Sequence, residues 1–298
     1  MKNQYVGDVG DFGKYSLLRI LAEKGIKVGV NWYLTEDDES NDGKFTDYLE
    51  KGKLRRFCPI VFDALADIAN KPDKSVKDIE LSGIIPGAVF YSELIRPVGT
   101  PDEREKERKR WFQKSMSKMS DADLIFMDPD NGLLESNDAT KRDAEKYVLP
   151  DEVEQYYNAG HDVVYYCHKG RRTWKQWEAY KSFMLDRIKD SKPIVLTYHK
   201  GSQRSYVFLV HEKNYLEYHK IAEEIVINRW YKVFSQEFTS LGDITRSTVG
   251  EPFTFKKDDG TVITIHEQYD GWIQIRSSAD RNTIRSMRKD VFCSFLGV

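Results

Sequence analysis

Short apolar runs alternate with longer segments of helical period along the first 230 residues of the chain. The runs lie at residues 28–34, 88–93, 123–127, 162–167, 193–198 and 206–210. They are continuously apolar, as expected for strands that are covered on both faces, and do not alternate with polar positions. Strands separated by helical segments are typical of a mostly parallel sheet packed between helices. The pattern therefore predicts an α/β, Rossmann-like fold.

The helical segments carry their own signals. Asp11 is placed to cap a first helix that Gly25 ends, and further amphipathic stretches cover residues 102–119, 174–188 and 215–227. Only residues 199–205 join the last two predicted strands. Because so short a connection cannot hold a crossover helix, these strands should form a terminal antiparallel hairpin.

The pattern changes after Trp230 to alternating strands at residues 252–256, 262–266 and 272–276, separated by Asp-Gly turns. We therefore predict two domains. Residues 1–230 would form the α/β domain, and residues 231–298 a small β-rich accessory domain.

Composition limits the partners of the chain. Its 298 residues include 46 Lys and Arg against 48 Asp and Glu, a formal charge of −2, so no overall field draws it to a polyanion and any nucleic-acid contact requires a local patch. The longest apolar runs span about five residues, too few to cross a membrane. The first residues lack the apolar stretch of a secretory signal, which favours the cytoplasm. Three widely spaced cysteines predict buried thiols, not a disulfide framework or a zinc site.

The strongest candidate for chemistry follows the third predicted strand. Asp128, Pro129, Asp130 and Asn131 come directly after an apolar run. In open parallel sheets, ligands bind beyond the carboxyl ends of the strands. An acidic residue there can accept a hydrogen bond from a substrate amine or hold a hard cation. We therefore predict a site at this edge of the sheet, with a Pro-Asp-Asn-Gly turn that serves only the backbone as the alternative.

A second candidate lies at the beginning of the first helix. Asp8, Asp11 and Lys14 occur in a glycine-punctuated segment, Gly7 to Tyr15, which is neither a Walker loop nor a dinucleotide-binding turn. Backbone donors at a helix start favour an anionic group, which the lysine could then hold. A purely structural cap is the alternative.

The third candidate is a local basic and aromatic patch in the two turns after the fourth and fifth strands. These turns resemble binding sites for nucleic-acid phosphates, with solvated loops as the alternative. The basic residues concerned are His168, Lys169, Arg171, Arg172, His199, Lys200 and Arg204.

The order of these pieces resembles the bacterial large-subunit ribosomal RNA adenine-N6 methyltransferases over roughly residues 3 to 228. The segment from Gly7 to Tyr15 is similar to their Gly-Asn-x-x-Asp-x-x-Lys-His, and Asp128-Pro129 to the Asp-Pro-Pro-Tyr that receives the target amine. Glu93 resembles the acid that holds the ribose of S-adenosylmethionine. The resemblance implies that Lys14, Glu93 and the loop of Asn31 and Trp32 bind this cofactor. It also implies that Asp128 and Pro129 accept from the exocyclic amine of a flipped base.

Two departures from this family are visible. The glycine-rich turn after the first strand is replaced by Asn-Trp-Tyr-Leu-Thr at residues 31–35, and the second proline and the aromatic residue are Asp130 and Asn131. Both segments are similar to those of an uncharacterised bacterial family. Since the aromatic residue stacks on the base, Trp32, Tyr33 or Tyr166 would have to replace it.

Three functions follow as hypotheses. The first is an S-adenosylmethionine-dependent methyltransferase acting on an amine of a nucleic-acid base, which needs no metal ion. The second is a nuclease or phosphodiesterase in which Asp128, Asp130 and Glu93 or Asp42 hold Mg²⁺. The third is a non-catalytic RNA-binding module that uses the basic patch.

Overall fold

The computed structural model describes residues 1–39, 45–167, 170, 172–201, 204–227 and 229–237, with the strand segments 253–256, 262–267, 272–277 and 284–288. The chain forms two compact units. One comprises Met1–His168 with Lys200–Tyr206, and the other Lys169–His199 with Val207–Val298. This division differs from the predicted boundary after residue 230, and an accessory domain at 231–298 stays a prediction.

Parallel strands form the centre of the first unit, in the order β2-β1-β3-β6, and β8 begins beside β6. The strands are β1 (Val28–Asn31), β2 (Val89–Tyr91), β3 (Leu124–Met127) and β6 (Asp162–Cys167). Their carboxyl ends are aligned, because Asn31 pairs with both Tyr91 and Met127, and Met127 pairs with Tyr165. The residues that follow the strands therefore lie along one edge of the sheet. The predicted α/β fold with a mostly parallel sheet is confirmed.

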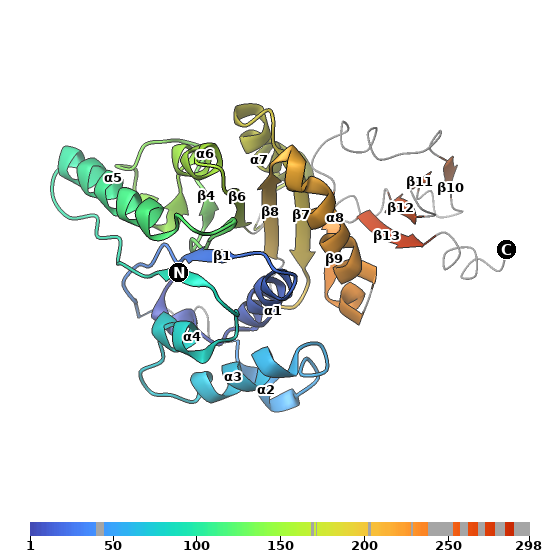
Figure 1. The fold of residues 1–298 in the computed structure, drawn as a ribbon, viewed down its shortest axis with the longest axis horizontal. Helices are drawn as coiled ribbons and strands as arrows, with labels where there is room; N and C mark the ends of the chain where they lie inside the picture. The colour runs from blue at the N-terminus through green and yellow to red at the C-terminus, as the bar shows by residue number, and fades with distance from the viewer. Residues whose placement is uncertain are drawn as a thin grey trace. The chain divides into compact units, whose positions relative to one another are not determined.

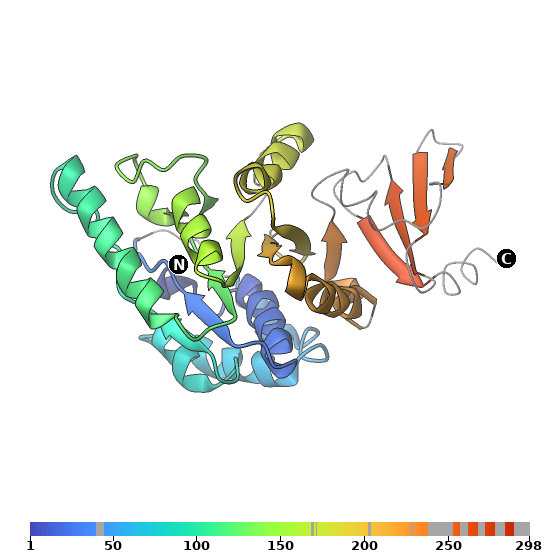
Figure 2. The same ribbon diagram turned by 45° about the horizontal axis from the view of Figure 1, so that its top comes forward.

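Helices cover both faces of this sheet. Helices α5 and α6 lie on one side of β1, and α1 lies on the other (Figures 1 and 2). Strand β3 is fully buried between them. The helices of the unit are α1 (Val9–Glu23), α2 (Asp47–Lys51), α3 (Pro59–Ala69), α4 (Val76–Ser82), α5 (Pro101–Lys118) and α6 (Pro150–Asn158). The shorter elements are η1 (Asn3–Tyr5), η2 (Ala144–Lys146) and the paired strands β4 (Gly132–Leu133) and β5 (Tyr147–Val148).

A buried ion pair joins α5 to α6. The Arg108 guanidinium donates to both carboxylate oxygens of Glu152, at 2.6 and 2.9 Å, and to the carbonyl of Tyr147. Glu152 also accepts from the hydroxyl of Tyr33 and the amide of Leu149. Because each oxygen has a donor, the two charges are balanced inside the core.

The second unit contains the end of the hairpin. It holds β7 (Lys192–Tyr198), the last four residues of β8 (Arg204–Val210), and the helices α7 (Trp174–Arg187) and α8 (Glu212–Ile227). Strands β7 and β8 are hydrogen-bonded neighbours, and their short connection makes them antiparallel, as predicted. After η3 (Arg229–Lys232), the described segments are strands β9 (Phe234–Glu237), β10 (Phe253–Lys256), β11 (Val262–Glu267), β12 (Trp272–Ser277) and β13 (Ile284–Arg288).

Two further expectations can be compared with the structure. Within the described part of the chain, every helix is too short or too polar to span a membrane. Of the cysteines predicted to be buried, Cys167 is buried and Cys58 is partly exposed, so the prediction is wrong for Cys58. Cys293 lies outside the described residues.

Candidate functional site

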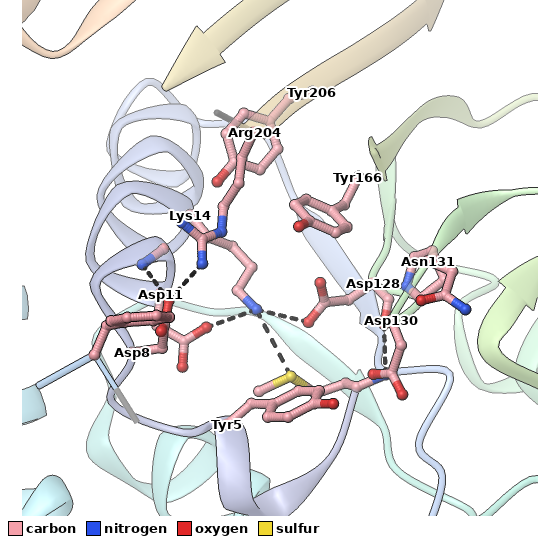
Figure 3. A pocket seen from close by; sticks show the side chains of 14 residues that line it. Tyr5, Asp8, Asp11, Lys14, Asp128, Asp130, Asn131, Tyr166, Arg204 and Tyr206 are labelled. Carbon is pink, nitrogen blue, oxygen red and sulfur yellow. Dashed lines mark hydrogen bonds and ion pairs between the residues drawn. The ribbon is translucent and has the colours of Figure 1, made fainter. Parts of the chain in front are cut away.

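A cavity of about 310 Å³ lies within the first unit, at the edge of the sheet where the parallel strands end. Its walls come from the amino-terminal segment, the first two turns of α1, the segment before α2, the loop after β3, the end of β6 and the start of β8. Figure 3 shows the side chains converging from these elements. The described residues that line it are Met1, Tyr5, Asp8, Gly10, Asp11, Lys14, Phe45, Asp128, Pro129, Asp130, Asn131, Tyr166, Arg204 and Tyr206.

Lys14 occupies the centre of the site. Its Nζ lies 2.8 Å from Oδ1 of Asp11 and 2.7 Å from Oδ2 of Asp128, and all three side chains are at most 7% exposed. Burial alone would lower the pKa of the Lys14 ammonium, but the two carboxylates raise it well above its usual value. Burial raises the pKa of Asp128, and Lys14 opposes this shift. Lys14 is therefore a permanent cation shared by two carboxylates.

Asp8 and Arg204 form a second buried pair. Asp8 Oδ1 accepts from the amide of Gly10 at 2.7 Å and from the Arg204 guanidinium at 2.6 Å. Asp8 is thus the N-cap of α1, and the prediction that Asp11 caps this helix is wrong. Asp11 instead accepts from the amide of Gly7, at 3.0 Å. Since two of the protein's own carboxylates take these amide donors, the backbone amides of the helix start do not form the anion site that we expected from its sequence.

The loop after β3 is tied to the amino-terminal segment. The α-ammonium group of Met1 lies 2.7 Å from Oδ1 of Asp130, and it donates to the carbonyls of Tyr33 and Asp128. Thr35 donates to the other oxygen of Asp130, at 3.1 Å. All four residues predicted as catalytic, Asp128, Pro129, Asp130 and Asn131, line the cavity.

Aromatic side chains form the rest of the wall. Tyr5, Tyr166 and Tyr206 line the cavity, and Phe45 is 67% exposed at its margin. Burial raises the pKa of Tyr166 to about 12, so its hydroxyl is neutral at physiological pH. Trp32 and Tyr33 are completely buried in the core. Of the three rings proposed to stack on a base, Tyr166 is therefore the one that faces the cavity.

The other residues predicted to bind the cofactor do not line the cavity. Asn31 is buried and donates to the hydroxyl of Tyr156, and Trp32 donates to Glu80 and stacks on Phe90. Neither lines the cavity. Glu93 follows β2 by two residues, where its carboxylate pairs with Lys114 at 2.5 Å and accepts from Tyr91. Lys14 lines the cavity, and the ring centroid of the buried Trp32 lies 5.8 Å from its Nζ. Glu93 lies outside the cavity, so the prediction that all four residues line one site is wrong.

The predicted basic patch is only partly described. His168, Lys169 and Arg171, like Asp42 of the magnesium hypothesis, lie outside the described residues. Arg204 belongs to the cavity wall and pairs with Asp8, so it is not a surface contact for phosphate. In the second unit, Arg172 lies 4.2 Å from the ring centroid of Tyr180, and His199 is exposed. Lys200 is half-buried in the first unit.

The carboxylates of the cavity are not arranged as metal ligands. Lys14 lies between Asp11 and Asp128, where a bound cation would otherwise sit. In the parts of the chain that the structure describes, no group of three or more His, Cys, Asp or Glu side chains is placed to hold a metal ion. The geometry therefore offers no particular support for the Mg²⁺-dependent phosphodiesterase.

Three aromatic residues of the site, Tyr5, Phe45 and Tyr206, were not predicted from the sequence. Tyr206 could have been found, because β8 runs against the other strands and its first residues must lie at the edge where they end. Tyr5 ends the short element η1, and Phe45 lies in the connection before α2. No strand or helix pattern in the sequence indicates their position.

The chain was compared with protein families, curated proteins and solved structures. No protein-family model and no curated protein matches the chain. A crystal structure of a Legionella pneumophila protein assigned to the family model DUF519 is similar over 78% of this chain and 96% of that one. The TM-score is 0.41 and the sequence identity is 12%.

Proposed function

We propose that the chain is an S-adenosylmethionine-dependent methyltransferase that acts on an amine of a nucleic-acid base. The observation that carries this proposal is the contact between Lys14 and Asp128, at 2.7 Å. These residues belong to the two segments that resemble the adenine-N6 methyltransferases, and they are 114 positions apart. The fold brings both segments to one cavity at the edge where such enzymes bind their ligands.

In this proposal, Asp128 would receive the amine. One of its carboxylate oxygens accepts from Lys14, and the other points toward Tyr166 (Figure 3). That oxygen and the adjacent Pro129 carbonyl would accept the two hydrogens of an exocyclic amine. Tyr166 would stack on the base in place of the aromatic residue that the Asp-Pro-Asp-Asn sequence lacks. The contribution of the enzyme is then positioning and a prearranged electrostatic environment.

The donor set fits one part of the cofactor. The amino-acid end of S-adenosylmethionine carries an ammonium and a carboxylate, and the cavity presents both carboxylates and cations to it. Asp8 and Asp11 would hold the ammonium, and Lys14 with Arg204 the carboxylate. When bound, the cofactor supplies the methyl group. Glu93 lies outside the cavity, so the ribose contact implied by the resemblance has no support from the geometry.

The partner and the cellular compartment in this proposal come from the sequence. We propose a nucleic acid as the partner, contacted by the exposed His199 and by Lys200, and the cytoplasm as the compartment. The overall charge of −2 makes such contacts local.

Calorimetric titration with S-adenosylmethionine tests the proposal. We expect the parent chain to bind the cofactor, Lys14→Gln to weaken binding by about tenfold or more through loss of a charged contact, and Glu93→Gln to leave it unchanged. Lys114 is the exposed lysine that pairs with Glu93, so Lys114→Gln is the matched control for the loss of a lysine charge and should leave binding unchanged. The proposal is wrong if the parent does not bind at millimolar cofactor, or if a folded Lys14→Gln variant binds as the parent does.

A further inference from the structure

Phe45 is a large apolar side chain that the fold leaves in contact with solvent at the margin of the cavity. The residue is 67% exposed and lines the cavity. The other large apolar side chains that are more than half exposed in the described part of the chain do not line it: Ile60, Leu81, Val98 and Leu216. Isolated exposed apolar residues are common in soluble proteins. An exposed ring at the entrance to a cavity needs a separate explanation.

The backbone of Phe45 is held against the first helix of the site. Its carbonyl accepts from the amide of Val9, at 3.1 Å, at the start of α1. Three residues later, the ring of Tyr48 packs against Phe12 and Phe62, with ring centroids 6.1 and 5.9 Å away. The exposed ring of Phe45 is therefore presented from a segment that is already fixed to α1, so binding to it requires little ordering of the chain.

The surroundings of this ring suit a nucleic-acid base. Figure 3 shows Tyr166 and Tyr206 on one side of the contact between Lys14 and Asp128, and Tyr5 on the other. Aromatic side chains stack on bases because every base has a flat π-face. The formal charge of the chain is −2, so its overall field does not attract phosphates. Stacking should therefore carry a large part of the affinity for a nucleic acid.

We infer that Phe45 stacks on the base next to the target base, and that the substrate is an unpaired, single-stranded segment of nucleic acid. This inference rests on the proposed function, in which Tyr166 takes the target base inside the cavity. Phe45 lies at the margin, where the neighbouring nucleotide of the same strand would pass. In a duplex, both faces of that neighbouring base are covered, so the ring could not stack on it.

Fluorescence anisotropy with a labelled single strand of mixed sequence, prepared as RNA and as DNA, tests the inference. We expect Phe45→Ala to weaken binding of the single strand about tenfold or more, as for the loss of one stacked base. Phe45→Leu keeps an apolar side chain without a ring and should weaken binding similarly, whereas Phe45→Trp should bind as tightly as the parent. Leu81→Ala removes a similarly exposed apolar side chain from α4, and it should leave binding unchanged.

Salt dependence separates stacking from a phosphate contact. The ring of Phe45 neutralises no phosphate, so its loss should lower the affinity by the same factor at every salt concentration. The slope of log affinity against log salt should therefore be the same for the parent and for Phe45→Ala, whereas loss of a phosphate contact would reduce it.

The same strand annealed to its complement completes the test. We expect the parent to bind this duplex more weakly than the single strand, and Phe45→Ala to bind the duplex as the parent does. The inference is overturned if Phe45→Ala binds the single strand as tightly as the parent, or if the parent prefers the duplex or binds neither form. The calorimetric titration of the parent with S-adenosylmethionine decides the proposed cofactor separately, so the two proposals can fail independently.

Discussion

Asp8 and Asp128 are carboxylic acids that the fold keeps almost out of contact with water. Burial is the largest influence on both groups and raises their pKa values, although a cation lies beside each of them. Arg204 is the cation beside Asp8, and Lys14 the one beside Asp128. Each carboxylate therefore retains its proton to a higher pH in the folded chain than in the unfolded one.

This shift gives Asp8→Asn a defined pH dependence. The folded state holds the Asp8 proton more tightly than the unfolded state does. The stability that this bound proton contributes is complete below the ordinary pKa of 3.8 and is lost as the pH rises through the raised pKa of the folded chain. Asparagine does not titrate. Urea unfolding from about pH 3 to about pH 7 should therefore show the variant gaining stability relative to the parent as the pH rises.

Asp138→Asn provides a control of opposite sign. The Thr140 hydroxyl and amide lower the pKa of Asp138, so this exposed carboxylate contributes stability at higher pH that is lost on acidification. Its variant should lose stability relative to the parent as the pH rises. If both variants follow the same trend, the assignment of Asp8 as a group destabilised by burial is wrong.

At the scale of elements, the start of α1 fits closely against the turn that leads into β8. A Cβ atom on Gly10 would lie 2.2 Å from Nε of Arg204, and one on Gly201 would lie 2.6 Å from Val9. Gly201 also has a φ of +71°, which disfavours a larger residue. Glycine on both sides lets the Arg204 guanidinium reach Asp8 across the first turn of the helix.

Gly10→Ala should therefore act through Arg204. In the parent we expect it to displace the guanidinium from Asp8 and to lower the free energy of unfolding by on the order of 2 kcal/mol, because a buried pair is broken. In an Arg204→Ala background the same change should be neutral or stabilising, since alanine is the better helix former. A double-mutant cycle by urea unfolding measures the coupling. Equal effects of Gly10→Ala in the two backgrounds would contradict this account.

Periodicity in the sequence predicts the long elements well and the short ones poorly. Predicted helix 102–119 is α5 (Pro101–Lys118), and predicted strand 162–167 coincides with β6. Helices α2, α3, α4 and α6 were not predicted. Of these, α2 and α4 have five and seven residues and complete too few turns to show an apolar stripe, whereas α3 and α6 have eleven and nine residues. The predicted strand 88–93 is longer than β2, which ends at Tyr91, so Glu93 lies beyond the strand end.

At the scale of the whole molecule, the aligned ends of the parallel strands explain which parts of the site could be predicted. Residues that directly follow a strand, such as Asp128, must lie at the common edge, and Lys14 reaches the same place from the helix beside β1. The prediction that Glu93 belongs to the site is wrong, because its carboxylate pairs with Lys114 of α5 outside the cavity. The sequence shows which side chains are charged. Which of them pair depends on tertiary packing, which no local sequence pattern predicts.

The central claim is that the cavity between the amino-terminal segment and Asp128 binds S-adenosylmethionine. A crystal structure of the chain grown with the cofactor tests it most directly. The account predicts density for the ligand in this cavity, with its charged end against Lys14, Asp11 and Arg204 and its methyl group facing Asp128 and Tyr166. Density instead beside Asn31, Trp32 and Glu93, with this cavity empty of the ligand, would contradict it.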